Sequence, residues 1–325
     1  MSTVATKASK PRTLSLDFGN YILKSFGGHR VKTIRSLQTP LAQGKLVLRS
    51  HDQSPIVEQN GQRWHLGSQC RRYTSTEATV LGDKAQLAQL HLAACIAESA
   101  DYQLVVSHHS PHQYEDFLRA TLLGEHRYLH NGNPVHVTVQ SVDVVAEGWG
   151  AYQLAKARNY VPQRGYTILI DLGGSTWLSS VYAADGELIA HDVHERQGTF
   201  ALAASIAKDT RLSKPLLERF SVTSPDPVVV QDGFLKGHFY GDSDLCWADW
   251  LSDYLDPWWK GIIQTLKARY QSHLPNVRRF LITGGGSNLI THKVAGSPAF
   301  LVLPEASTAN VQGAFFAAQP ALVAA

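Results

Sequence analysis

Residues 167–182 read TILIDLGGSTWLSSVY, and this stretch decides the fold. It begins with a short apolar run, Ile168 to Ile170, which is typical of a buried strand in a parallel or mixed sheet. The run ends at Asp171, and a glycine turn and a second β-like run, Trp177 to Tyr182, follow at once. The pattern predicts a strand–turn–strand hairpin with a carboxylate at its mouth.

The turn of this hairpin suits an anionic ligand. Its glycines let the backbone approach a ligand closely, and consecutive turn N–H groups form a cradle for anions. The carboxylate of Asp171 cannot bind phosphate directly, but it can hold Mg2+ through water, as magnesium prefers. Taken alone, the stretch fits an ordinary hairpin equally well.

The same layout occurs again in residues 14–24, LSLDFGNYILK: an apolar strand, Asp17, a glycine turn and a second strand. This copy adds Lys24, seven positions after the aspartate. A third glycine turn, residues 284–287, follows the apolar run Phe280 to Thr283 near the C-terminus. Three glycine turns at strand ends, two of them led by an aspartate, indicate a duplicated fold that closes on a nucleotide.

The three segments resemble the phosphate-1, phosphate-2 and adenosine motifs of the actin, sugar kinase and heat-shock chaperone superfamily. The wording DLGGST and the ending Ala309 to Gly313, ANVQG, are most similar to bacterial and archaeal actin-like proteins of the ParM/StbA type. The resemblance runs in order from about residue 13 to about residue 318. It implies an α/β fold of two duplicated actin-like (ribonuclease H-like) domains around a nucleotide cleft.

The resemblance also implies a domain layout. It gives domain I at 13–158, with a small inserted subdomain at about 40–82 and completed by a C-terminal helix at about 305–320, and domain II at 159–304, with an outer subdomain at about 209–272. Residues 1–12 lack the apolar core of a signal peptide and are expected to be a disordered lead-in.

Composition describes an ordinary globular protein. The chain has 325 residues, enough for two domains with substantial cores, and is 44% hydrophobic and 18% charged. A formal net charge of +3 is too small to predict direct nucleic-acid binding, and no apolar run is long enough to cross a membrane. Three scattered cysteines, without a CxxC spacing, predict reduced thiols in a cytoplasmic protein.

The hydrophobic pattern and turn residues predict the other elements. Expected strands lie at about 13–18, 21–27, 30–38, 55–58, 62–66, 103–107, 135–145, 187–193 and 299–303. Expected helices lie at about 84–99 with Asp83 as N-cap, 111–122 with Ser110 as N-cap, 146–158, 200–208, 213–220, 244–272, 288–295 and 306–318.

Four aromatic residues fall at helical spacing within the longest expected helix. Their spacings of three, four and four place them on one stripe, which indicates either a core-facing stripe or a subunit interface, where Trp and Tyr are enriched. The four are Trp247, Trp250, Tyr254 and Trp258.

Glu147 lies between the end of an expected strand and the start of the expected helix that links the two halves. In ParM-like proteins the glutamate at this step helps to position the attacking water, so the resemblance implies a catalytic role. A carboxylate at a helix N-terminus also stabilises the helix dipole, and that role remains open beside the catalytic one.

The resemblance implies a site for ATP, with GTP as an open alternative, and for Mg2+. Asp17 and Asp171 would hold hydrated Mg2+, and Lys24 would offset charge on the β- and γ-phosphates. Hydrolysis in such a site depends on positioning and electrostatics, with Glu147 and Asp171 as its catalytic residues. The remaining nucleotide-binding residues are Gly19, Asn20, Gly173, Gly174, Ser175, Thr176, Gly284, Gly285 and Gly286.

Two positions depart from the family pattern. Many ParM-like sequences have an acidic residue two places after the phosphate-2 threonine, where this chain has Leu178. Trp177 before it is bulky for a strand start next to phosphates. The loss of the acidic residue affects the details expected of metal binding rather than the fold.

The function implied is a Mg-dependent ATPase that polymerises into nucleotide-dependent filaments, for plasmid or DNA segregation or for intracellular positioning. Its expected partners are further copies of itself and a DNA-bound adaptor, without direct nucleic-acid or membrane binding. Two alternatives remain open: a small-molecule kinase of the same superfamily, and a non-polymerising ATP-binding scaffold or cell-division protein. A kinase needs a carboxylate base at the acceptor hydroxyl, and the first half offers no convincing second catalytic aspartate.

Overall fold

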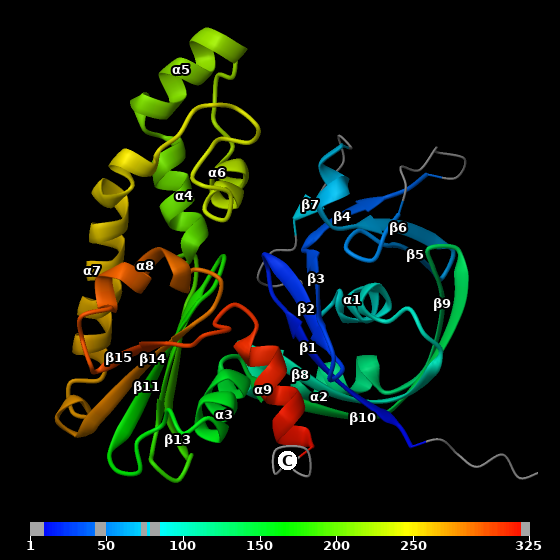
Figure 1. Cartoon of the computed structure of the whole chain (residues 1–325). Helices are drawn as coiled ribbons and strands as arrows, with labels where there is room; N and C mark the ends of the chain where they lie inside the picture. The colour runs from blue at the N-terminus through cyan, green and yellow to red at the C-terminus, as the bar shows by residue number, and fades with distance from the viewer. Residues whose placement is uncertain (1–9, 43–49, 73–76, 79–84, 320–325) are drawn as a thin grey trace, which may run out of the picture. The chain divides into compact units, whose positions relative to one another are not determined.

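A computed structural model of the chain describes residues 10–42, 50–72, 77–78 and 85–319. Two compact units make up the chain (Figure 1). Unit 1 comprises residues 1–157 and 308–325, and unit 2 comprises residues 158–307. Asp83, the expected N-cap of the first helix, lies outside the described residues.

Unit 1 is built on a mixed sheet whose described strands run in the order β3-β2-β1-β8-β10-β9-β5-β6-β4-β7. β1 pairs in parallel with β8, and β8 pairs in parallel with β10, while β2, β3 and β9 add antiparallel. The strands are β1 Arg12–Phe18, β2 Ile22–Phe26, β3 Val31–Arg35, β4 Leu37–Pro40, β5 Ile56–Gln59, β6 Gln62–Leu66, β7 Glu77–Ala78, β8 Ala100–His108, β9 Gly124–His130 and β10 Asn133–Ala146.

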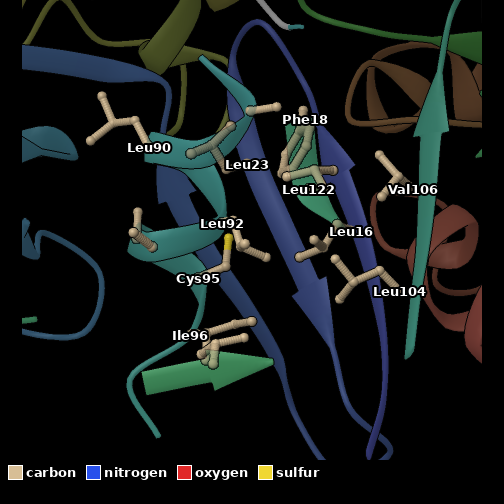
Figure 2. Packing of buried hydrophobic residues seen from close by; sticks show 14 of the residues in the cluster. Leu16, Phe18, Leu23, Leu90, Leu92, Cys95, Ile96, Leu104, Val106 and Leu122 are labelled. Carbon is tan, nitrogen blue, oxygen red and sulfur yellow. The ribbon is translucent and has the colours of Figure 1, made fainter. Parts of the chain in front are cut away.

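The core of unit 1 lies between this sheet and two helices, α1 Ala88–Cys95 and α2 Pro111–Leu122. Figure 2 shows Leu16 and Phe18 of β1 packing with Leu92 of α1, together with apolar side chains of β2 and β8. Leu16 and Phe18 alternate with Ser15 and Asp17, so the polar side chains of β1 point to the opposite face of the sheet.

That opposite face carries α9, Ala309–Ala318, which crosses α3, Trp149–Ala157. Val311 and Phe315 of α9 pack against Phe26 of β2. Glycine lets the two helix backbones touch, because a Cβ on Gly150 would collide with the Asn310 carbonyl. The contact brings α9 onto the sheet edge where β8 and β10 end.

Unit 2 has a five-stranded sheet in the order β13-β12-β11-β14-β15. Ile168 and Ile170 of β11 point into its core, where they meet apolar residues of α4, α7 and α8. The strands are β11 Tyr166–Leu172, β12 Trp177–Tyr182, β13 Leu188–His194, β14 Val277–Thr283 and β15 Phe300–Val302. The helices are α4 Thr199–Ala207, α5 Thr210–Phe220, α6 Pro227–Gly233, α7 Ser252–Arg269 and α8 Ser287–Val294.

The two units repeat one plan. In unit 2, β11 is antiparallel to β12 and parallel to β14, and β12 is antiparallel to β13. The order β3-β2-β1-β8-β10 has the same sequence of pairings, so β11, β12 and β14 correspond to β1, β2 and β8. The predicted α/β class is confirmed, and the repeated order is a duplication visible in the topology.

Some expected elements have other bounds in the structure, and one observed helix was not expected. The strand expected at 30–38 is two strands, because the chain leaves β2 at Ser36 and β4 pairs with β6 instead. The helix expected at 84–99 is shorter, since α1 ends at Cys95 and Ile96 is extended. The residues between α5 and α7 contain α6, whose start has a sequence signal: Asp226 accepts a hydrogen bond from the Val228 N–H, and Pro227 takes the first helical position.

The helix expected to begin near residue 244 begins at Ser252. Trp247 instead lies in the preceding loop and is fully buried, with its ring so close to Gly233 that a Cβ there would collide with it. Trp250, Tyr254 and Trp258 are partly buried and pack against the same core, which favours the core alternative, although Trp247 and Trp250 both precede α7. In the described part of the chain, no helix is both long and apolar enough to cross a membrane.

Candidate functional site

Asp17 and Lys24 form the centre of the candidate site in unit 1. They are directly opposite each other on β1 and β2, and Lys24 Nζ lies 3.0 Å from Asp17 Oδ2. The Lys24 side chain is only 17% exposed and the Asp17 side chain only 9%, so water screens this pair less than a surface pair. The structure therefore places the predicted carboxylate beside the predicted lysine.

Neighbouring strands bring further polar groups to the same sheet edge. Ser107 of β8 lies beside Asp17 in the parallel register, with Ser107 Oγ 3.3 Å from Asp17 Oδ1. Glu147 follows the last residue of the next strand, β10, and is buried. Its N–H donates to the His108 carbonyl over 3.0 Å. In α/β proteins, ligands bind at the carboxyl ends of parallel strands, which is where these groups lie.

Glu147 lies in a turn rather than in a helix. α3 begins at Trp149, so the helix expected from residue 146 starts later. Gly148 between them has a φ of 86°, a conformation that favours glycine. The turn therefore fixes where the Glu147 side chain leaves the backbone.

The turn at Gly19 and Asn20 has the close backbone packing predicted for a phosphate-binding turn. A Cβ on Gly19 would lie 2.5 Å from the Ile22 carbonyl oxygen, and the Ser36 hydroxyl donates to the Gly19 carbonyl. The Asn20 Oδ1 atom is buried and has no hydrogen-bond partner among the described residues. A buried acceptor without a partner is costly, which suits a position completed by a ligand or its hydration water.

In unit 2, Asp171 lies near the end of β11 and directly beside the third glycine turn. Its Oδ1 atom occupies the place that a Cβ on Gly284 would need, and Gly284 has a φ of 88°. The Gly286 N–H donates to the Leu172 carbonyl over 2.8 Å, which fastens this turn to the end of β11. Asp171 of the predicted phosphate-2 motif thus lies beside the glycines of the predicted adenosine motif. By contrast, a Cβ on Gly285 would meet no atom within 4 Å.

The loop between β11 and β12 is supported by the first residues of α4. The N–H groups of Thr199 and Phe200 donate to the carbonyls of Gly173 and Gly174 over 3.1 and 2.8 Å, and the Gly198 N–H donates to Ser175. The positive end of the α4 dipole therefore holds the loop carbonyls. These bonds use none of the N–H groups of Gly173, Gly174 or Ser175. Thr176, which ends the loop, is buried.

Gln231 of α6 is part of this support, although the sequence analysis did not identify it. Its side chain is buried, and its Nε2 atom donates to the Gly174 carbonyl over 3.2 Å and to Thr199 Oγ1 over 2.9 Å. Ser107 was also missed, and Asn310 was used only as part of a family-like ending. All three form contacts with residues distant in the sequence, so only a structure reveals their roles.

The two departures from the family pattern have structural explanations. Trp177 points into the core of unit 2 and stacks on His194, with ring centroids 3.7 Å apart, which explains how a bulky residue fits at this strand start. Leu178 is directly opposite Asp171 and is buried. Because directly opposed residues share a face, an acidic residue at position 178 would have lain beside Asp171. Unit 2 thus presents one carboxylate at this place.

Comparisons with known proteins agree with this architecture. Residues 15–150 match the family model of the actin-like proteins' N-terminal domain. No curated protein matches the sequence significantly. Among solved structures, the archaeal actin homologue Ta0583 is similar with a TM-score of 0.76 at 15% identity, over 95% of this chain and 99% of that one.

Two further solved structures have the same fold. A complex of Ta0583 with ADP has a TM-score of 0.73 at 15% identity, over 95% of this chain and 99% of that one. The ParM of a 15-stranded filament from Clostridium botulinum has a TM-score of 0.74 at 13% identity, over 96% and 99%. The match to the actin-like N-terminal domain family thus covers residues 15–150, and nearly the whole chain has the fold of these actin-like and ParM structures.

Proposed function

We propose that this protein binds a nucleoside triphosphate with Mg2+ and hydrolyses it. The observation that carries the proposal is the repeated placement of an aspartate and a glycine turn. Asp17 and Asp171 occupy corresponding positions on β1 and β11, each followed by a turn with close backbone packing. One such turn is common in proteins, but two in corresponding places of a duplicated fold favour a phosphate-binding role for each.

The residues present fit a magnesium–nucleotide complex. Carboxylate oxygens are the ligands that Mg2+ prefers, usually through water, and Asp17 and Asp171 supply them. Lys24 supplies the positive charge for phosphate, and the unpartnered Oδ1 of Asn20 supplies an acceptor. When bound, the ion would neutralise charge that develops on the phosphates. A complex of a structurally similar archaeal homologue contains ADP, which supports the choice of an adenine nucleotide, with GTP as the alternative.

Glu147 is the residue best placed to orient the attacking water. It is a buried carboxylate on the sheet edge that also carries Asp17, one strand beyond Ser107. A carboxylate in such a position can accept a proton from water and direct its oxygen. Since phosphoryl transfer depends mainly on positioning and electrostatic stabilisation, one such group completes the chemistry.

We further propose that hydrolysis is coupled to self-association into filaments, in the cytoplasm, with a DNA-bound adaptor linking the filament to cargo. The support is the ParM filament among the similar folds. Hydrolysis removes the contacts of the γ-phosphate, and the loss of these contacts can shift a conformational equilibrium on which packing between copies also depends.

Light scattering and negative-stain microscopy with Mg2+ and ATP, ADP, GTP or no nucleotide test this coupling, with phosphate release followed in the same samples. The proposal expects filaments with triphosphate that decay as phosphate appears. Hydrolysis by a protein that stays monomeric would remove the filament and favour the kinase or scaffold alternatives. Absence of both hydrolysis and nucleotide binding would overturn the proposed function as a whole.

A further inference from the structure

Asn310, near the start of α9, makes three hydrogen bonds at the edge of the unit 1 sheet. Its Oδ1 atom accepts from the N–H groups of Gly148 and Gly150 over 3.2 and 3.1 Å. Its Nδ2 atom donates to Ser107 Oγ over 3.1 Å. The side chain is buried, so water competes little for these bonds.

The two ends of the Asn310 amide reach two different parts of the candidate site. Gly148 lies in the same turn as Glu147, and Gly150 lies at the start of α3. The Oδ1 end therefore fixes the backbone from which the glutamate side chain projects. Ser107 Oγ lies 3.3 Å from Asp17 Oδ1, so the Nδ2 end reaches the metal-binding aspartate through one hydroxyl. One side chain therefore connects the proposed metal ligand with the proposed water-orienting residue.

The hydrogen bonds of the Ser107 hydroxyl show which group donates to which along this connection. A serine hydroxyl has one proton to donate and lone pairs that accept. Because Ser107 accepts from Asn310, its proton is left for Asp17 Oδ1, at 3.3 Å, or for the Leu16 carbonyl, at 3.4 Å. A donor to Asp17 Oδ1 fixes the orientation of its carboxylate, while Lys24 binds the other oxygen.

Glycines at the contact between the two helices let α9 come close enough for these hydrogen bonds. α9 approaches α3 so closely that Cβ atoms on Gly150 and Gly313 would collide with the facing backbone. Only this approach brings an α9 side chain within reach of the N–H groups at the start of α3. Those N–H groups have no partner within their own helix, because the first N–H groups of any helix lack one.

We propose that Asn310 is a positioning residue for nucleotide hydrolysis. It holds the Glu147 turn directly and the Asp17 carboxylate through Ser107. The proposal rests on the hydrolytic function proposed above. It assigns the C-terminal helix a role in catalysis, through the geometry of two residues of the proposed site.

Steady-state hydrolysis of Mg-ATP by four variants of the full chain tests the proposal. Asn310→Ala removes both ends of the amide, and we expect kcat to fall about 10- to 100-fold, because small displacements of a reacting group cost about that much. Ser107→Ala removes only the Asp17 branch, and we expect KM to rise while kcat changes less than threefold. Asn310→Asp keeps the acceptor for Gly148 and Gly150, and should recover most of the kcat lost in the alanine variant.

Gln312→Ala is the matched control on the same helix. It removes the 2.7 Å hydrogen bond from Gln312 Nε2 to Thr308 Oγ1. This bond joins α9 to its own N-cap residue and reaches no site residue. Its kcat and KM should equal those of the wild type. If Asn310→Ala folds and its kcat matches that of Gln312→Ala, Asn310 has no positioning role and the proposal is wrong.

Amide hydrogen exchange separates this proposal from the proposed function. Gly148 and Gly150 should be protected in the wild type, exposed in Asn310→Ala and protected again in Asn310→Asp. A wild type that fails to hydrolyse any triphosphate refutes the proposed function and, with it, the catalytic part of this one. If exchange at Gly148 and Gly150 is unchanged in Asn310→Ala while the wild type hydrolyses ATP, the positioning proposal alone fails.

Discussion

Asp17 and Asp171 occupy the same place in the two sheets, and their neighbours correspond as well. Each is opposite a residue seven positions further along the chain, Lys24 for Asp17 and Leu178 for Asp171. Each lies beside a hydroxyl residue on the parallel strand, Ser107 for Asp17 and Thr283 for Asp171. The two copies therefore differ mainly in charge: one aspartate has a cation opposite it, and the other has an apolar side chain.

This difference predicts that Lys24 is needed by both the fold and the ligand. Lys24→Ala leaves the largely buried Asp17 without its cation, and we expect a loss of about 1.5–3 kcal/mol in the free energy of unfolding. Nucleotide affinity should fall at least tenfold, because a charge on the phosphates is no longer offset. Urea unfolding and equilibrium binding of a fluorescent nucleotide measure the two effects.

Lys214→Ala is the control for that variant. Lys214 pairs with Glu218 on α5 over 3.9 Å, with both side chains mostly exposed. Such a surface pair contributes about 0–1 kcal/mol, and it lies away from the glycine turns. Equal effects of the two substitutions would show that the Asp17–Lys24 pair has no special role.

The third glycine turn offers a comparison between adjacent residues. Gly284→Ala puts a Cβ against Asp171 Oδ1 at a φ of 88°, so it should destabilise the protein by about 1–3 kcal/mol and weaken Mg-nucleotide binding. Gly285→Ala meets open space and should leave the unfolding free energy within about 0.5 kcal/mol. If Gly285 faces the nucleotide, its alanine variant binds more weakly at unchanged stability. Full binding by both variants would remove this turn from the site.

Gln231 is expected to maintain the shape of the phosphate-2 loop. Gln231→Ala leaves the buried Gly174 carbonyl and Thr199 hydroxyl without their donor, and we expect a loss of about 1–3 kcal/mol in stability together with weaker nucleotide binding. Gln264→Ala, on the exposed surface of α7, is the control and should change neither quantity. A Gln231 variant with wild-type affinity would show that the loop keeps its shape through α4 alone.

Stability should depend on pH through His194. Burial beside Trp177 lowers the pKa of His194, although the nearby Asp192 opposes the shift and Arg269 adds to it. As pH falls through about 6.5, the unfolded chain binds a proton that the folded chain does not, so the unfolding free energy decreases. The decrease ends below the lowered pKa of the folded state. The stabilisation is therefore fully present above about pH 7.

Urea midpoints between pH 7.5 and 5 measure this dependence. His194→Phe, which keeps a ring against Trp177, should flatten the curve relative to the wild type. Gln113→Ala, at an exposed position on α2, should leave the curve as it is. Burial also lowers the pKa of His65, His130 and His238, so part of the slope should remain in the His194 variant. An unchanged slope in His194→Phe would contradict the assignment.

The sequence predicted the parts of this protein that depend on local pattern. The hairpins around Asp17 and Asp171 follow from apolar runs interrupted by glycine, and the α/β class follows from their repetition. Trp247 shows where this fails, since its spacing fits a helix but the ring is buried from a loop. Ser107, Gln231 and Asn310 could not be predicted because their partners are distant in sequence, as with Asn310 and Ser107, 203 positions apart.

The most direct test of the central claim is phosphate release from Mg-ATP by the wild type and by Glu147→Gln, with nucleotide binding measured on the same preparations. The account predicts that the wild type releases phosphate only with Mg2+, and that the variant binds ATP normally but releases phosphate at least 100-fold more slowly. Equal turnover by the two proteins would contradict the role of Glu147, and absence of ATP and GTP binding in the wild type would contradict the account itself.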